Sequence, residues 1–197
     1  MLRTHLATAL GKQNIGENVR LSGWVDTIRD HGGIKFLDLR DFSGIMQIVL
    51  HDDAMLDGVN REAVISISGK LRARSEETVN PKHSTGYIEV LAETLEILGS
   101  CRNMLPFEIN ESKATREDLR MMFRYLDLRN PAVRNNIILR ADVIDFIRRQ
   151  MVKLGFLEVQ TPILTASSPE GARDYLVPSR KHKGKFYALP QAPQIFK

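Results

Sequence analysis

The sequence is poor in cysteine and in long apolar runs, and both absences exclude whole classes of protein. Its single cysteine, Cys101, excludes a disulfide framework within the chain and a metal cluster built from several cysteines. The apolar runs fall far short of the roughly 20 residues that a membrane-spanning helix needs. The first residues also lack the apolar core of a signal peptide. We therefore expect a cytoplasmic protein without a membrane partner.

Several short catalytic motifs are absent as well. The sequence contains no phosphate-binding GxxxxGK(S/T), no metal-binding HExxH and no nucleophile elbow GxSxG. These patterns therefore predict neither a metal site nor a catalytic nucleophile. What is present is an ordinary globular composition, with 43% hydrophobic and 26% charged residues among 197. A chain of this length can bury a core without metals or disulfides.

Charge is distributed unevenly along the chain. Residues 1–110 contain 12 basic and 15 acidic side chains, whereas residues 111–197 contain 16 basic and 9 acidic ones. The first part therefore has a net charge of −3 and the second a net charge of +7. If the first part binds nucleic acid, it must use a few placed side chains, because bulk attraction to phosphates has to come from the second part.

The first hundred residues predict a small barrel. The apolar pattern and the Gly-rich turns indicate five strands, at 18–25, 34–40, 45–50, 63–74 and 86–98. A short helix is expected between the third and the fourth strand. The helix is expected over Asp53–Glu62. Five strands with a helical segment at this place have the element order of an OB-fold.

Periodicity is lost after Leu98, and the composition of residues 98–111 indicates a linker between domains. A short helix is expected over Glu117–Tyr125. Asn130 and Pro131 then predict the start of a long helix. Its apolar residues recur at steps of three and four and form one stripe, which comprises Ile137, Ala141, Ile144, Ile147, Met151 and Leu154.

Three short strands are predicted after the long helix, at Phe156–Thr161, Tyr175–Pro178 and Phe186–Leu189. The basic segment Arg180–Lys185, with His182 inside it, separates the last two. This segment has two interpretations, a site for phosphate groups or a solvated hairpin tip, and the sequence leaves both open.

Phe36 is a candidate for nucleic-acid binding. Strand alternation places it on one face with Asp38 and Arg40. An aromatic ring among charges on a small barrel offers a platform on which a base can stack. Arg29 and Gln47, on the neighbouring strands, could supply hydrogen bonds. The alternative is that Phe36 belongs to the core and that a bulge breaks the alternation.

The segment Ser168–Asp174 combines two carboxylates and an arginine in a loop with glycine and proline. Such a loop suits a small zwitterion, because Glu170 could face an ammonium group while the loop closes. The alternative is a solvated surface loop with a local ion pair. Gln194 and Lys197 follow further on, and a lysine can pair with the carboxylate of a ligand.

Longer stretches resemble the bacterial-type aspartyl-tRNA synthetases, a class II family. The most specific are GARDYLVPSR and FYALPQ, and the others include Arg29–Gly33, Phe36–Asp41, Arg124–Arg129 and Phe156–Pro162. The resemblance implies an all-β five-stranded OB-fold barrel followed by an α+β portion of a catalytic domain. It places the anticodon-binding OB-fold at 1–105, a hinge at 106–134, and motif 1 with part of the aspartate pocket at 135–197.

The resemblance also assigns roles to single residues. It implies that the anticodon is contacted by Arg29, Phe36, Gln47 and Glu89 and that aspartate is contacted by Glu170, Gln194 and Lys197. Pro162 closes the motif 1 segment that builds a homodimer. The resemblance also implies that both tRNA(Asp) and tRNA(Asn) are charged, with His31 as the deciding residue and Glu77 as a residue that shares in the choice. Family members that charge both tRNAs often have histidine at the position of His31, where stricter members have leucine.

The activity that the resemblance implies is aspartate–tRNA ligation, in which ATP, L-aspartate and tRNA give aspartyl-tRNA through aspartyl-adenylate. The complete enzyme would use ATP and Mg²⁺. The given sequence stops before motifs 2 and 3, so we expect it to contain no catalytic residue and to bind no cofactor. Two alternatives remain, a stand-alone tRNA-binding OB-fold protein and an asparaginyl or other class II relative. The retained aspartate-pocket residues and GARDYLVPSR favour the ligase.

Overall fold

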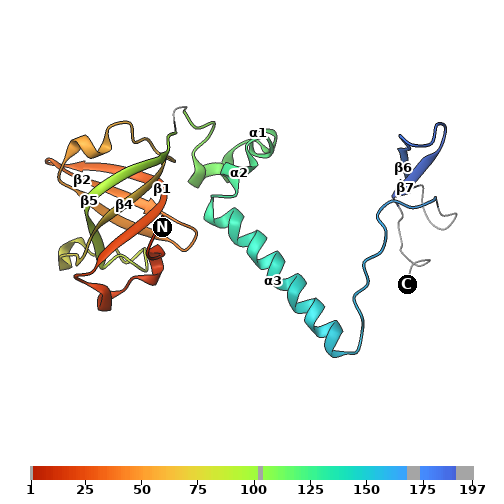
Figure 1. Ribbon diagram of the computed structural model, residues 1–197, viewed down its shortest axis with the longest axis horizontal. Coiled ribbons are helices and arrows are strands. Elements are labelled where there is room, and N and C mark those ends of the chain that lie inside the picture. The colour runs from red at the N-terminus through yellow and green to blue at the C-terminus, as the bar shows by residue number, and fades with distance from the viewer. Residues whose placement is uncertain (1, 102–103, 168–173, 190–197) are drawn as a thin grey trace. The chain divides into compact units, whose positions relative to one another are not determined.

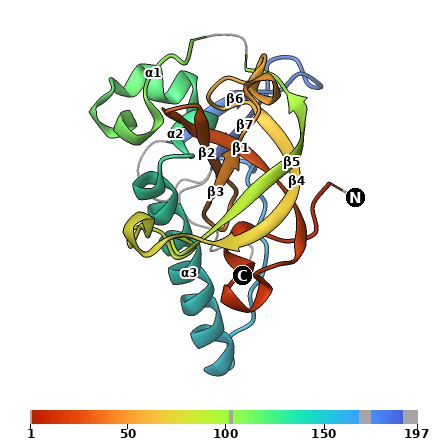
Figure 2. The same ribbon diagram turned by 90° about the vertical axis from the view of Figure 1, so that its left-hand side faces the viewer.

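Five strands close into a barrel in the first part of the chain (Figures 1 and 2). They are β1 (Asn18–His31), β2 (Ile34–Arg40), β3 (Ile45–Leu50), β4 (Val64–Ala73) and β5 (Ile88–Gly99). Around the barrel the order is β1-β2-β3-β5-β4. Neighbouring strands are antiparallel, except that β3 and β5 run parallel. The predicted OB-fold barrel is confirmed.

This computed structural model describes residues 2–101, 104–167 and 174–189. The chain divides into two units, residues 1–104 and residues 105–197. The barrel lies in the first unit. The second unit holds the helices α1 (Glu117–Met122), α2 (Arg124–Asp127) and α3 (Pro131–Lys153) and the strands β6 (Tyr175–Pro178) and β7 (Phe186–Leu189).

Strand alternation separates the barrel core from its surface. On β2, Leu37 and Leu39 are almost fully buried in the core, while Phe36 lies on the opposite face. The interpretation of Phe36 as a core residue is therefore wrong. The rest of the core comes from all five strands and the N-terminal segment, and its fully buried members include Val25, Met46, Ile48, Ile65 and Val90.

Two glycines allow barrel strands to approach each other closely. A Cβ atom on Gly69 would lie 2.1 Å from the carbonyl oxygen of Leu91, and one on Gly23 would lie 2.4 Å from that of Arg40. Gly69 also sits where the β4–β5 register shifts. Only a residue without a side chain fits at these positions, where the barrel bends.

Several expected boundaries differ from the structure. The first strand runs through to His31, because its pairing with β2 continues past a register shift between Val25 and Thr27. The helix expected over 53–62 is a short 3₁₀ helix at Asp53–Leu56. The strand expected at Phe156–Thr161 is wrong, since this segment is extended but pairs with no strand within the described residues. Hydrogen bonding to a neighbour is what makes an extended segment a strand.

The segment expected to be a hinge contains a small core of its own. Phe107, Ile109 and Leu126 are buried together there. The fully buried Asp127 carboxylate accepts hydrogen bonds from Arg120 at 3.0 and 3.2 Å and from Arg124. Burial alone would raise the pKa of Asp127, but the arginine hydrogen bonds and charges outweigh it and hold this pKa below its ordinary value.

The long helix α3 begins as predicted, with Asn130 as its N-cap and Pro131 in its first turn. The Asn130 side chain accepts a hydrogen bond from the amide of Ala132 at 2.9 Å, which satisfies a free donor of the first turn. The predicted apolar stripe forms, but its residues stay exposed within the described part of the chain, as Ile147 at 55% and Leu154 at 72% show.

The strands β6 and β7 form an antiparallel hairpin with the predicted bounds (Figure 1). Thr165 pairs with Ala188 of β7 through two backbone hydrogen bonds of 3.0 and 2.8 Å. No helix within the described residues is long and apolar enough to cross a membrane.

Candidate nucleic-acid interface

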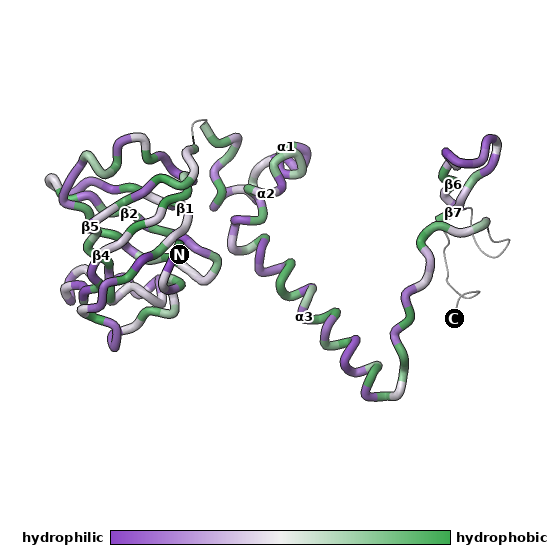
Figure 3. The backbone as a smooth tube through the Cα atoms, viewed as in Figure 1, coloured by the Kyte–Doolittle hydropathy of each residue, from purple (hydrophilic) through white to green (hydrophobic). Residues whose placement is uncertain are grey.

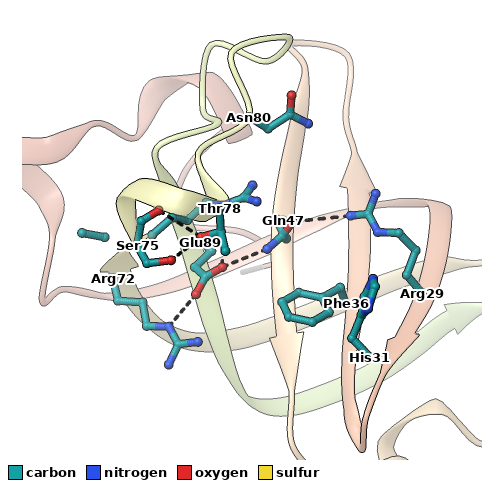
Figure 4. A pocket seen from close by; sticks show the side chains of 11 residues that line it. Arg29, His31, Phe36, Gln47, Arg72, Ser75, Thr78, Asn80 and Glu89 are labelled. Atoms are coloured by element: carbon teal, nitrogen blue, oxygen red, sulfur yellow. Dashed lines mark hydrogen bonds and ion pairs between the residues drawn. The ribbon is translucent and has the colours of Figure 1, made fainter.

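A pocket of about 690 Å³ lies on the outer face of the barrel (Figure 4). Strands β1 to β5 and the segment after β4 all contribute to its lining, which consists of Arg29, His31, Phe36, Gln47, Arg72, Ala73, Arg74, Ser75, Thr78, Asn80 and Glu89. Five of these residues, Arg29, His31, Phe36, Gln47 and Glu89, are candidates from the sequence. The fold therefore brings together residues that lie up to 60 positions apart in the chain.

Strand register explains this convergence. Arg29 on β1 faces Phe36 on β2, and two residues further along β2 Asp38 faces Gln47 on β3. On the other side of the pocket, Arg72 on β4 faces Glu89 on β5. Residues at alternate positions share a face of the sheet, so each strand presents its polar side chains outward while its apolar ones fill the core.

A chain of hydrogen bonds runs across the floor of the pocket. Arg29 donates to Asp38 at 2.8 Å and to Gln47 at 3.4 Å. Gln47 in turn donates from Nε2 to Glu89 Oε2 at 2.8 Å, and Arg72 donates from Nε to Glu89 Oε1 at 2.7 Å (Figure 4). The side chains of Asp38 and Glu89 are only 11% and 9% exposed, so both guanidinium groups are held by buried acceptors.

Arg74 adds an unsatisfied donor to the same pocket. Its side chain is 10% exposed and its Nε lies 4.0 Å from Glu89 Oε2, beyond hydrogen-bond distance. Within the described part of the chain this Nε has no hydrogen-bond partner. A buried donor without a partner costs about 1–3 kcal/mol. An acceptor on a bound ligand would remove that cost.

The turn between β1 and β2 positions His31 beside the Phe36 ring. The two ring centroids are 6.0 Å apart and the rings are inclined by 74°, an edge-to-face arrangement. Lys35 donates to Asp30 across this turn and, with a weaker bond from the Gly33 amide, holds the pKa of Asp30 below its ordinary value. The same contact raises the pKa of Lys35.

Six residues of the pocket were not among the candidates from the sequence, namely Arg72, Ala73, Arg74, Ser75, Thr78 and Asn80. Lys70 and Arg72 on β4 and Arg74 directly after it occupy alternate positions, and this alternation of basic residues at the strand end was the available signal. Ser75, Thr78 and Asn80 follow in the loop to β5 and gave no comparable signal. Glu77 lies in the 3₁₀ helix Glu76–Thr78 of this loop, is exposed, and does not line the pocket.

The residues expected to contact aspartate, Glu170, Gln194 and Lys197, lie outside the described residues. Pro162 is exposed in the extended segment after α3 and lines a shallow hollow with residues 160–164. Within residues 2–101, 104–167 and 174–189, no cluster of three or more His, Cys, Asp or Glu side chains could hold a metal ion.

Two protein families match the two parts of the chain. Residues 19–98 match the OB-fold nucleic acid binding domain, and residues 116–197 match the class II tRNA synthetases of the D, K and N group. A protein from Anaplasma phagocytophilum named aspartate–tRNA(Asp/Asn) ligase is 54% identical over the whole chain. Over its whole length the chain is similar to aspartate–tRNA ligases. A ligase of the same name from Erythrobacter litoralis is 53% identical over 99% of the chain.

The chain spans about a third of the length of these curated aspartyl-tRNA synthetase relatives, 34% for the Anaplasma protein and 33% for the Erythrobacter protein. Solved structures support the fold. The asparaginyl-tRNA synthetase from Pyrococcus horikoshii, complexed with asparaginyl-adenylate, matches all of the chain and 44% of its own length with a TM-score of 0.81 and 24% identity. An aspartyl-tRNA synthetase from Entamoeba histolytica matches 86% of the chain and 42% of its own length, with a TM-score of 0.71 and 20% identity.

Proposed function

We propose that the chain is part of an aspartate–tRNA ligase and that its barrel pocket binds the anticodon loop of tRNA. One observation carries this proposal: five residues that the family resemblance assigns to anticodon contact or choice line a single pocket. The match of residues 116–197 to class II synthetases favours a ligase over a stand-alone RNA-binding OB-fold protein.

The chemistry of the pocket suits unpaired bases. The partly buried Phe36 ring provides a stacking surface, and stacking of a base on an aromatic side chain is worth about 1–3 kcal/mol. Arg29 and Arg72 are both 43% exposed, so their guanidinium groups remain accessible while the buried carboxylates orient them. Such held donors lose little conformational freedom when a ligand binds.

The remaining roles of the complete enzyme belong to the same proposal. Glu170 would face the ammonium group of aspartate, Lys197 would face its side-chain carboxylate, and Gln194 would assist. Lys197 would thereby select aspartate over asparagine. ATP and Mg²⁺ would serve the adenylation step through parts of the enzyme that this sequence does not include. The segment that ends at Pro162 would form part of a homodimer interface. The complete enzyme would act in the cytoplasm.

The choice of tRNA is the finest part of the proposal. His31 lies on the rim beside Phe36, and its ring nitrogens can donate or accept a hydrogen bond. This supports a relaxed enzyme that charges both tRNA(Asp) and tRNA(Asn), as the names of the relatives state for those proteins. Glu77 would influence the choice only through the neighbouring loop residues.

A binding measurement tests the anticodon site. The chain is titrated with a labelled anticodon stem-loop of tRNA(Asp) at fixed salt, as wild type and as Phe36→Ala. We expect the variant to bind about 5–150-fold more weakly, which corresponds to the loss of about 1–3 kcal/mol of stacking. The matched control is Phe42→Ala, since Phe42 is 62% exposed in the turn after β2 and does not line the pocket.

The control variant should bind the stem-loop like the wild type. Equal binding by all three proteins would refute the stacking role of Phe36. No binding by the wild type would refute the anticodon site as a whole.

A further inference from the structure

The tip of the β6–β7 hairpin is a dense basic cluster that the proposed anticodon site does not use. Arg180, Lys181, His182, Lys183 and Lys185 lie within six consecutive positions, all exposed. No acidic residue occurs between Tyr175 and Leu189. Figure 3 shows the tip as one continuous hydrophilic segment beyond the two strands.

The cluster has a defined shape rather than a loose one. The Ser179 amide donates to the Lys185 carbonyl at 3.0 Å, and the His182 amide donates to the Ser179 hydroxyl at 3.1 Å. Gly184 takes a φ of +73°, which lets the chain turn where a side chain would be strained. The hairpin therefore presents its cations at the end of a paired strand unit.

The charges at this tip are not neutralised within the described residues. None of the five side chains forms an ion pair there, whereas Arg148 and Arg149 on α3 pair with Glu158 and Asp145. Cations that the protein leaves unpaired stay available to an external polyanion. The tip also contains no apolar residue between Ser179 and Lys185, so it lacks an anchor for a lipid surface.

We propose that the β6–β7 tip is a second RNA contact, which binds backbone phosphates of a tRNA outside its anticodon loop. The inference rests on the proposed function, because a protein that binds tRNA at its barrel has RNA as its polyanionic ligand. The distribution of charge along the chain supports the same contact. Residues 1–110 have a net charge of −3, so net attraction to a polyanion has to come from the later residues, and the tip places four formal positive charges in six residues.

Salt dependence tests the tip. Binding of complete tRNA and of the isolated anticodon stem-loop is measured against NaCl concentration for the wild-type chain and the triple variant Lys181→Gln, Lys183→Gln, Lys185→Gln. The control triple is Lys70→Gln, Lys113→Gln, Lys153→Gln, which removes the same charge from dispersed exposed lysines. We expect the tip variant to reduce the slope of log K against log salt by about 2–3 for complete tRNA. Its binding of the stem-loop should stay unchanged.

The control triple should alter the slope for complete tRNA by less than about 1, because dispersed charges make no set of phosphate contacts. Equal slopes for the two triples would overturn the second RNA contact and leave the anticodon site standing. Tip-dependent tRNA binding without stem-loop binding would instead overturn the anticodon site. Tip-dependent binding to phosphatidylglycerol vesicles with unchanged tRNA binding would identify a lipid surface and overturn the proposal. A wild-type chain that binds no tRNA would overturn both.

Discussion

Single side chains in the barrel pocket are arranged so that buried carboxylates hold exposed cations. Asp38 and Glu89 each accept hydrogen bonds from an arginine whose far side stays open to solvent. Charge-assisted bonds of this kind are stronger and shorter than neutral ones. The pocket therefore offers donors to a ligand at fixed positions without a high local positive charge.

His31 provides the sharpest prediction for a single residue. In His31→Leu the ring nitrogens are lost, and leucine offers no polar contact to a base. We expect the variant to bind an asparagine anticodon stem-loop about 2–10-fold more weakly, which corresponds to a hydrogen bond worth about 0.5–1.5 kcal/mol. The aspartate stem-loop should be affected less. Competition binding with the two stem-loops measures the ratio, and charging of both tRNAs by the complete enzyme extends it.

His51→Leu is the matched control for this experiment, because His51 is exposed after β3 and does not line the pocket. It should leave the ratio of the two affinities at its wild-type value. A wild-type chain that fails to bind the asparagine stem-loop would contradict the relaxed tRNA choice.

Local sequence patterns predict some residues of the pocket and not others, and the difference has a physical reason. Phe36 stands out because an aromatic side chain interrupts the polar face of an alternating strand. Arg72 and Glu89 meet only through the β4–β5 register, and Asn80 reaches the pocket through the path of a loop. Register and loop path depend on contacts between distant segments, so local patterns do not show them.

Secondary-structure elements follow the sequence best where local signals agree. The start of α3 was predictable because Asn130 caps it and Pro131 favours its first turn. The bounds of β6 and β7 were predictable from the turn between them. The segment at Phe156–Thr161 has the composition of a strand, yet it forms none within the described residues because pairing is a property of the partner as well.

The Asp41 side chain connects the turn between β2 and β3 to the N-terminal segment through hydrogen bonds. Its carboxylate accepts hydrogen bonds from the amides of Ala7 at 2.8 Å, Ser43 at 2.7 Å and Gly44 at 3.0 Å. Burial alone would raise the pKa of Asp41, but these bonds and that of the Ser43 hydroxyl outweigh it and hold the pKa below its ordinary value.

Asp41→Asn should therefore destabilise the barrel by about 1–3 kcal/mol at pH 7, because a charged acceptor of several amides is lost. A lowered pKa in the folded state means that the stabilisation is present above the unfolded pKa and disappears as pH falls through the folded one. The difference between wild type and variant should thus shrink below about pH 4. Urea unfolding followed by the fluorescence of Trp24, the single tryptophan, measures it within the barrel.

Asp57→Asn serves as the comparison, since Asp57 is exposed and its side chain forms no hydrogen bond or ion pair within the described residues. It should change the free energy of unfolding by less than about 0.5 kcal/mol. A difference between wild type and Asp41→Asn that stays constant down to pH 3 would contradict the proposed role of the carboxylate.

At the scale of the whole molecule, the chain consists of two units with separate cores. The barrel core is drawn entirely from residues before 102, and the small core around Phe107 and Leu126 comes entirely from the second unit. The exposed stripe of α3 belongs to the second unit as well. Stability of the barrel should thus be independent of the rest of the chain.

A truncated chain of residues 1–104 tests this independence. We expect it to fold alone, because a closed barrel needs no edge partner. Its urea midpoint, measured by Trp24 fluorescence, should equal that of the complete chain, and it should retain binding of the anticodon stem-loop. A free energy of unfolding lowered by more than about 1 kcal/mol in the truncated chain would show that the second unit stabilises the barrel.

The pairing pattern of the barrel has a consequence for how fast it forms. Strands β1, β2 and β3 are joined by short turns, and β4 and β5 pair with each other, but the two groups meet only where β1 pairs with β4 and β3 with β5. The last of these seams is two residue pairs long and links positions more than 40 residues apart. Closing such a loop lowers the entropy of the chain before the stabilising contacts of the pairing have formed. We expect the closure of the β3–β5 seam to be a late step and the barrel to fold in milliseconds to seconds, in the slow range for small domains.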